Sequence, residues 1–281
     1  MPLTPTRTLV ARAAADHTGV GAFNVISLET AEGLVSAAER SGRGVILQIS
    51  ENCIAYHGGL EPIAAATLAI AAASTADVAV HLDHATDETL AIRAIDQGFG
   101  SVMFDGAHLE YSDNVAATRR VVAAAHATGV FVEAELGTIG GKDGAHAPGV
   151  RTDPAEAAAF AAETGVDALA VAVGSSHAMS NRDASLDIDL IARIAEAVPA
   201  PLVLHGSSGV PDDQIVLAIA AGMTKINVST HLNGFFTRAV RDALDADPAL
   251  VDSRRYLAAG RTALSAEAER LLTLFATRPA G

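Results

Sequence analysis

Three residues near position 80 carry side chains that could do chemistry. In the segment VAVHLDHATDETL, residues 78–90, His81, Asp83 and His84 stand within or directly behind an apolar run. Imidazole nitrogens are common metal ligands, and a neighbouring carboxylate can take up or return a proton. A solvated turn would explain the same residues. The choice depends on where this segment ends relative to the rest of the fold.

Histidines follow other apolar runs of the chain as well. Of the ten histidines, His84, His177 and His205 come at or just past the ends of three such runs, whereas His81 lies inside its run and reads as a core residue. Imidazoles gathered at one rim are the neutral nitrogen ligands that zinc prefers, and three protein ligands leave the fourth position open, as in catalytic zinc sites. Spacing alone does not select these three residues, because ligands from different strands follow no short-range rule.

The elements that must position these side chains alternate along the chain. Eight short apolar runs, each followed by a stretch with helical spacing, cover residues 21–25, 44–50, 78–84, 101–106, 130–136, 168–174, 201–206 and 225–230. Such alternation predicts a closed parallel (β/α)8 barrel, the TIM barrel of the α/β class. An open doubly wound sheet is the alternative, but the first turn, GAFNVISLET, lacks the pattern G-x-G-x-x-G.

In a parallel barrel, the carboxyl ends of the strands share one face, and active sites form there. The predicted strands end in or near polar residues: Asn24, Ser50, Asp83, His84, Asp105, Glu135, His177, His205, Asn227, Ser229 and Thr230. The turns LHGSSG (204–209) and INVST (226–230) follow strands seven and eight, where barrels commonly hold a phosphate with backbone N–H groups. We therefore expect a site for a phosphorylated ligand at this face.

Composition limits the classes of partner. The chain has 281 residues and a formal net charge of −14, which disfavours nucleic acid and anionic membrane surfaces. Cys53 is the only cysteine, and the N-terminus lacks the apolar core of a signal peptide, so a cytoplasmic protein is expected. No linker or change of composition divides the chain. We expect one barrel domain over residues 1–281, with a C-terminal helical extension.

With these residues placed, the chain resembles the class II, metal-dependent ketose-bisphosphate aldolases of the fructose- and tagatose-bisphosphate type. The similarity extends over most of the chain, and its motifs are HLDH, SVMFDGAHL, EAELGTIGG, VAVGSSHAM, LHGSSG and KINVST. The resemblance implies reversible cleavage of a ketose (bis)phosphate to dihydroxyacetone phosphate and an aldehyde, expected to be glyceraldehyde 3-phosphate. It also implies Zn2+ as cofactor, Na+ or K+ as a further ion, and a homodimer or homotetramer.

The resemblance also implies roles for single residues. His84, His177 and His205 match the zinc ligands, Asp83 matches the acid/base carboxylate, and Asp105 and Glu135 match residues that bind a second or displaced metal or organise the first. The positions that match the substrate-binding segments are Ser50, Gly206, Ser207, Ser208, Asn227, Val228, Ser229 and Thr230. Asn24, at the end of the first predicted strand, is a further candidate for binding substrate. Arg254 and Arg255 are candidates for binding the far end of the aldehyde.

Three positions depart from the family pattern. Ala178 stands where glycine is usual beside the phosphate, and His231 stands where an acidic residue is common. In the segment GGKDG, Lys142 stands near the position of a glutamate that moves the C1 proton in this family. We expect Asp143, the acidic residue next to it, to take over that role.

Three other functions fit part of the pattern. A Schiff-base aldolase needs a lysine in the barrel mouth, and of the two lysines Lys142 is predicted in a loop and Lys225 at the opening, amino-terminal end of strand eight. A metal-dependent sugar-phosphate epimerase needs two carboxylates facing across the metal, which Asp83 with Asp105 or Glu135 could supply. An inactive barrel that only binds sugar phosphate would explain the altered GGKDG segment.

Overall fold

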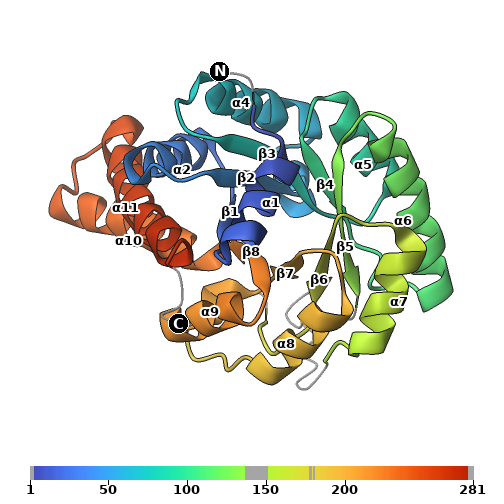
Figure 1. Ribbon diagram of the computed structural model, residues 1–281. Coiled ribbons are helices and arrows are strands. Elements are labelled where there is room, and N and C mark those ends of the chain that lie inside the picture. Colours follow the sequence, from blue (N-terminus) through green and yellow to red (C-terminus); the bar gives the residue numbers. More distant parts are fainter. Residues whose placement is uncertain (1–2, 137–150, 177–178, 180, 278–281) are drawn as a thin grey trace.

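The computed structural model describes residues 3–136, 151–176, 179 and 181–277. Within these residues, eight parallel strands close into a barrel in chain order (Figure 1). The strands are β1 (Val20–Asn24), β2 (Val45–Ser50), β3 (Val78–Ala85), β4 (Ser101–Phe104), β5 (Phe131–Leu136), β6 (Ala168–Val171), β7 (Leu202–Leu204) and β8 (Met223–Val228). The predicted (β/α)8 barrel is confirmed.

Helices surround the barrel and connect its strands (Figure 1). They are α1 (Thr6–Asp16), α2 (Leu28–Ser41), α3 (Glu51–Tyr56), α4 (Leu60–Ala73), α5 (Glu88–Asp96), α6 (Tyr111–His126), α7 (Pro154–Thr164), α8 (Ile188–Ala197), α9 (Asp212–Ala220), α10 (Thr230–Ala246) and α11 (Ser253–Phe275), with a 3-10 turn η1 (Ser207–Gly209). Asp87 and Asp153 cap α5 and α7 by accepting hydrogen bonds from backbone N–H groups. Local sequence thus sets where these helices begin.

Helix α1, which the sequence did not predict, lies across the amino-terminal end of the barrel (Figure 1). Its Leu9, Val10 and Ala13 are buried in one apolar cluster with residues of the strands. The strand residues of that cluster are Val20, Ala22, Ile46, Ala79, Met103, Phe131, Ala168, Ala170 and Val203. This end is therefore filled by apolar side chains, which leaves the carboxyl ends of the strands as the open face of the barrel.

Several strands end or begin earlier than predicted. Strands β4 and β7 end at Phe104 and Leu204, so Asp105 and His205 follow the strands instead of lying inside them. Strand β8 begins at Met223, directly after Gly222, whose φ of 124° breaks the preceding helical turn. As a result Lys225 lies in the middle of β8, not at its opening end.

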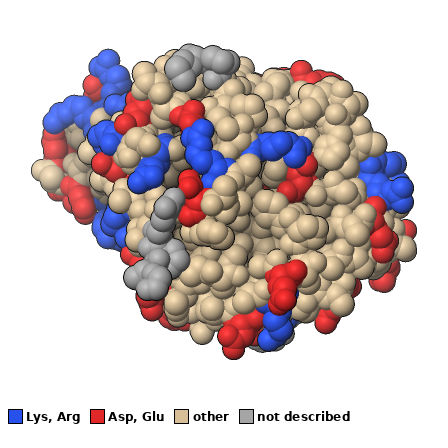
Figure 2. All heavy atoms as spheres, viewed as in Figure 1, with Lys and Arg blue, Asp and Glu red and all other residues tan. Residues whose placement is uncertain are grey.

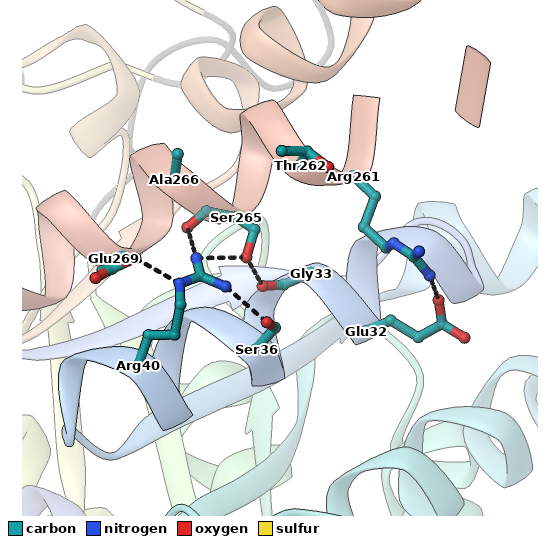
Figure 3. A pocket seen from close by; sticks show the side chains of 9 residues that line it. All are labelled: Glu32, Gly33, Ser36, Arg40, Arg261, Thr262, Ser265, Ala266 and Glu269. Atoms are coloured by element: carbon teal, nitrogen blue, oxygen red, sulfur yellow. Dashed lines mark hydrogen bonds and ion pairs between the residues drawn. The ribbon is translucent and has the colours of Figure 1, made fainter. Parts of the chain in front are cut away.

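Helix α11 packs along α2 on the outside of the barrel. Gly33 allows this approach, because a Cβ there would lie 3.2 Å from the Arg261 carbonyl oxygen. A groove of about 590 Å³ runs between the two helices, and the charged groups that line it are paired: Arg40 with Glu269, and Arg261 with Glu32 (Figure 3). These ion pairs connect the C-terminal helix α11 to α2.

The described surface carries both signs of charge. On the face seen in Figure 2, basic and acidic side chains are interspersed and are densest where Figure 1 shows α2, α10 and α11. Among the described residues, no helix is long and apolar enough to cross a membrane.

Candidate active site

Polar side chains fill the barrel in two layers toward its carboxyl face. Alternate residues of a strand point the same way, so Asp83, Glu135 and Asn227 each have a buried partner two residues earlier on the same side. Those partners are His81, Glu133 and Lys225, all with no exposed surface. The sequence analysis selected the layer of Asp83, Glu135 and Asn227 as site residues. It missed Glu133 and Lys225 in the layer below. The spacing of two within each strand was the signal that would have found them.

The end of β3 brings two adjacent residues into the site. Neighbouring strand residues normally point to opposite faces, but the pairing of β3 with β4 shifts between Leu82 and Ala85. Within this bulge His84 adopts a left-handed φ of 53°, a conformation that a non-glycine residue adopts only at a cost. The bulge lets His84 join Asp83 on the inner side. The motif HLDH therefore serves a site and not a plain turn.

His84 and His205 face each other, and each is held from behind by a carboxylate. His84 Nδ1 lies 2.8 Å from Asp105 Oδ2, and His205 Nε2 lies 2.8 Å from Glu133 Oε1. The remaining nitrogens, His84 Nε2 and His205 Nδ1, are 3.0 Å apart. Because a carboxylate only accepts hydrogen bonds, the neutral rings carry their protons on the carboxylate side. Two lone pairs then point at one another across the gap.

This arrangement fits a cation. Facing lone pairs repel unless a proton or a positive ion lies between them, and imidazole nitrogens are preferred zinc ligands. Two nitrogens bound to one tetrahedral zinc at about 2.0–2.1 Å stand about 3.3 Å apart, close to the separation seen here. Asp83 joins the same group of potential ligands, since one of its carboxylate oxygens lies within 4.8 Å of a ring nitrogen of each histidine. The donor set therefore suits a divalent metal ion.

Asp83 is buried and points toward the two imidazoles. Asn24 Nδ2 donates to its Oδ2 at 2.9 Å, and Gln48 Nε2 in turn donates to Asn24 Oδ1 at 2.8 Å. Burial opposes ionisation, but the positive charge that His84 and His205 carry when protonated, the Lys225 ammonium and the Asn24 hydrogen bond together outweigh it and lower the pKa of Asp83 to about 2. The carboxylate is thus ionised at neutral pH. Its Oδ1, 3.9 Å from His84 Nε2, accepts no hydrogen bond from the described residues.

Asp105 and Glu135 form a second acidic group beside His84. Together with His84 they offer ligand atoms within 4.8 Å of one another, and Glu135 Oε2 lies 3.8 Å from His84 Nδ1. Both carboxylates are almost fully buried. Asp105 orients His84 in the present arrangement. The expectation that the pair binds a second or displaced metal stays a prediction.

The segments after β7 and β8 meet at the same face. Gly206 has a φ of 69°, and a Cβ there would lie 2.7 Å from the carbonyl carbon and oxygen of Ser176, so only glycine fits between them. Ser208 Oγ accepts a hydrogen bond from Ser229 N–H and thereby joins η1 to the start of α10, where Thr230 is the first helical residue. Ser207 Oγ donates to the Leu204 carbonyl. The first turn of α10 offers backbone N–H groups of the kind that hold phosphate.

The other residues predicted to bind substrate differ in where their side chains lie. Asn227 Nδ2 lies 3.1 Å from His205 Nε2, and Ser50, which caps α3, pairs with Asp83 in the register of β2 and β3. The side chain of Val228 points away into the outer apolar core, so only its backbone can contact a ligand. His177 and Asp143 lie outside the described residues, as do Ala178 and Lys142. Their roles stay predictions from sequence.

Comparisons with known proteins agree with this geometry. The family model for class-II fructose-bisphosphate aldolase matches residues 4–279. A fructose-bisphosphate aldolase of Thermus caldophilus is 38% identical over 95% of this chain and 96% of its own, and one of Geobacillus stearothermophilus is 40% identical over 88% of each. The YdjI aldolase from Escherichia coli K12 superposes with a TM-score of 0.85 at 29% identity, covering 97% of both chains.

The chain belongs to the class-II fructose-bisphosphate aldolase family. It is a metal-dependent aldolase that cleaves a ketose bisphosphate, and the recognition made from the motifs is confirmed. The matches give no support to the epimerase or to the inactive sugar-phosphate-binding barrel.

One argument used against a Schiff-base aldolase was wrong in its detail. Lys225 lies inside the barrel, fully buried, with its Nζ 2.8 Å from Glu133 Oε2, and not at the amino-terminal end of β8. The error came from placing the start of β8 two residues too late. The lysine is nonetheless bound in an ion pair, and membership of this aldolase family assigns the metal-dependent mechanism.

His231, where this aldolase departs from the family pattern, belongs to a chain of ion pairs. Its Nε2 lies 2.6 Å from Glu267 Oε1, and Arg270 binds both Glu267 and Asp212. Asp212 also pairs with Arg182 at 2.7 Å. The network joins α11 to the segments that follow β6, β7 and β8. It thereby supports the loops beside the expected phosphate site.

We expect Glu267→Gln to destabilise the protein by about 2 kcal/mol at neutral pH. Burial raises the pKa of Glu267, but His231 and Arg270 outweigh burial and lower it from 4.5 to about 2. A depressed pKa stabilises the fold above the unfolded value, so the difference between the two proteins should shrink as pH falls from about 4.5 toward about 2. Urea denaturation at neutral pH and at several pH values below about 4.5 measures both effects.

Glu269→Gln is the matched control for this prediction. Glu269 lies on the same helix and pairs with Arg40, but its side chain is 37% exposed, so its loss should cost less than about 1 kcal/mol. Equal losses for the two variants would show that the Glu267 network contributes no more than a surface pair.

Proposed function

We propose that this aldolase cleaves fructose 1,6-bisphosphate between C3 and C4, giving dihydroxyacetone phosphate and glyceraldehyde 3-phosphate, with Zn2+ bound by His84, His177 and His205. Two of the relatives named above are fructose-bisphosphate aldolases, which supports fructose as the ketose. The observation that carries the proposal is the pair of nitrogens, His84 Nε2 and His205 Nδ1, 3.0 Å apart and each fixed by a carboxylate behind its ring.

When bound, the metal ion supplies Lewis-acid polarisation of the substrate carbonyl. The residues of the chain do the rest. Asp83, ionised and held by Asn24, accepts the proton of the C4 hydroxyl as the C3–C4 bond breaks, and returns it in the direction of condensation. Backbone N–H groups around Ser208, Ser229 and Thr230 hold the phosphate of the dihydroxyacetone half. Asp143 delivers a proton to the carbon that was C3 of the ketose and so completes dihydroxyacetone phosphate, as its place in GGKDG suggests.

Further features of the proposal concern ions and assembly. A monovalent cation, Na+ or K+, would accompany the phosphate. Two observations support a homodimer or homotetramer. At the outer end of α10 and α11 the apolar side chains of Val251 and Leu244 are 89% and 37% exposed. In α10 itself, only Leu232 is buried. Arg254 and Arg255 lie at that end and pair with Asp252 and Asp247. A cytoplasmic location fits the single cysteine.

A cleavage assay with a chelator tests the function. We expect turnover of fructose 1,6-bisphosphate to exceed that of tagatose 1,6-bisphosphate, to fall at least about 100-fold when the metal is removed, and to return with Zn2+. Borohydride added with substrate should leave the activity unchanged. Activity that survives the chelator but is lost to borohydride would contradict the proposal and indicate a Schiff base.

A further inference from the structure

A buried carboxylate lies beneath the expected metal site. Glu133 of β5 has no exposed surface, and its two oxygens have different partners. Oε1 lies 2.8 Å from His205 Nε2, and Oε2 lies 2.8 Å from Lys225 Nζ. The Lys225 ammonium, equally buried, is the counter-charge that makes a carboxylate tolerable at this depth. Neither residue faces the open mouth of the barrel.

The contact with Glu133 determines which nitrogen of His205 is available. A carboxylate only accepts, so the ring donates from Nε2 and keeps the lone pair on Nδ1. Asn227 Nδ2 lies 3.1 and 3.4 Å from the two ring nitrogens. An atom so nearly equidistant from both lies over the ring face, because a partner in the ring plane of one nitrogen is far from the other. Asn227 therefore does not compete with Glu133 for the N–H.

We propose that Glu133, charge-balanced by Lys225, is the positioning residue that fixes His205 in the Nε2–H tautomer and directs its Nδ1 at the metal. The inference rests on the proposed zinc site. Glu133 does for His205 what Asp105 does for His84, whose Nδ1 lies 2.8 Å from Asp105 Oδ2. Partners of this kind raise the basicity of a metal-binding imidazole and hold its ring in place. Glu133 itself contacts neither substrate nor reacting atoms.

Replacing Glu133 alone would leave the Lys225 charge buried without a counter-charge, with only Gln48 Oε1 at 3.5 Å to accept from it, which is strongly destabilising. The test therefore uses the double variant Glu133→Gln with Lys225→Met, which removes both charges and keeps the volume of the side chains. An amide can donate as well as accept, so it no longer selects one tautomer. We expect zinc affinity, measured by competition with a chromophoric chelator, to fall about 10- to 100-fold.

The tautomer gives a readout that is independent of activity. In metal-free protein with 15N-labelled histidine, His205 should show the Nε2–H form in the wild type and a mixture of forms in the double variant. At saturating zinc, the kcat of the double variant should lie closer to the wild-type value than its zinc affinity does. Ser101→Ala is the control, because Ser101 binds His81 Nδ1 at 2.8 Å in the same buried layer but does not contact His205. Its zinc affinity should stay at the wild-type value.

The outcomes separate this inference from the proposed function. If the wild-type protein bound no zinc, the proposed function itself would be contradicted. If the wild type binds zinc but the double variant binds it equally tightly, the role of Glu133 is overturned while the proposed function stands. The same holds if His205 of the wild type is in the Nδ1–H form. An equal loss in Ser101→Ala would also overturn it, because the effect would then belong to the packing of the layer.

Discussion

Replacing Asp83 by Asn should lower kcat for ketose bisphosphate cleavage about 1,000-fold, with zinc affinity changed only a few-fold. The amide keeps the shape of the side chain and can still accept the hydrogen bond that Asn24 donates at 2.9 Å. It cannot take up a proton from the C4 hydroxyl. Steady-state kinetics at saturating zinc, together with zinc titration of the same preparation, measures the two quantities.

Asn24→Ala is the companion variant to Asp83→Asn. It removes the hydrogen bond that orients Asp83 but leaves the carboxylate, so we expect a loss of kcat nearer 10-fold, about one hydrogen bond in magnitude. If Asp83→Asn kept more than a tenth of the wild-type kcat, Asp83 would not be the proton acceptor, and another group would have to be sought.

His205→Ala should abolish cleavage, with a loss of at least about 1,000-fold, because it removes a metal ligand. The zinc content of the purified protein should fall from near one ion per chain to a small fraction of that. The variant also leaves Glu133 without the partner 2.8 Å away, so folding should be verified by thermal unfolding. Elemental analysis and the cleavage assay report the metal and the activity separately.

His57→Ala serves as the control for the loss of a histidine. His57 Nε2 lies 2.8 Å from the Ile26 carbonyl and belongs to no cluster of metal ligands among the described residues. Its replacement should leave zinc content at the wild-type level. A full zinc content in His205→Ala, or an equal loss in His57→Ala, would contradict the assignment of the ligand.

The eight strands and the open face of the barrel could be predicted because both depend on short-range patterns. Apolar runs and helical spacing locate the strands, and the fold places all carboxyl ends on one side. Asp83, His84, Asp105, Glu135 and His205 accordingly meet where the sequence predicted. Their pairing could not be predicted, since the contact of His205 with Glu133 joins residues 72 positions apart.

The bulge in β3 and the helix α1 show where sequence reasoning stops. The sequence HLDH does not indicate that His84 adopts a left-handed φ, because that conformation comes from the pairing of β3 with β4. Helix α1 has few strong patterns of its own and is held by apolar contacts with the strand residues it covers. Lys225 was misplaced for a similar reason, because only strand pairing fixes where β8 begins.

X-ray absorption at the zinc edge, combined with a crystal structure of the zinc-loaded protein, tests the central claim most directly. The account predicts one zinc ion with imidazole nitrogens at about 2.0–2.1 Å, among them His84 Nε2 and His205 Nδ1, and an open coordination position beside Asp83. Zinc bound elsewhere on the protein, with these two rings still facing each other and unligated, would contradict it.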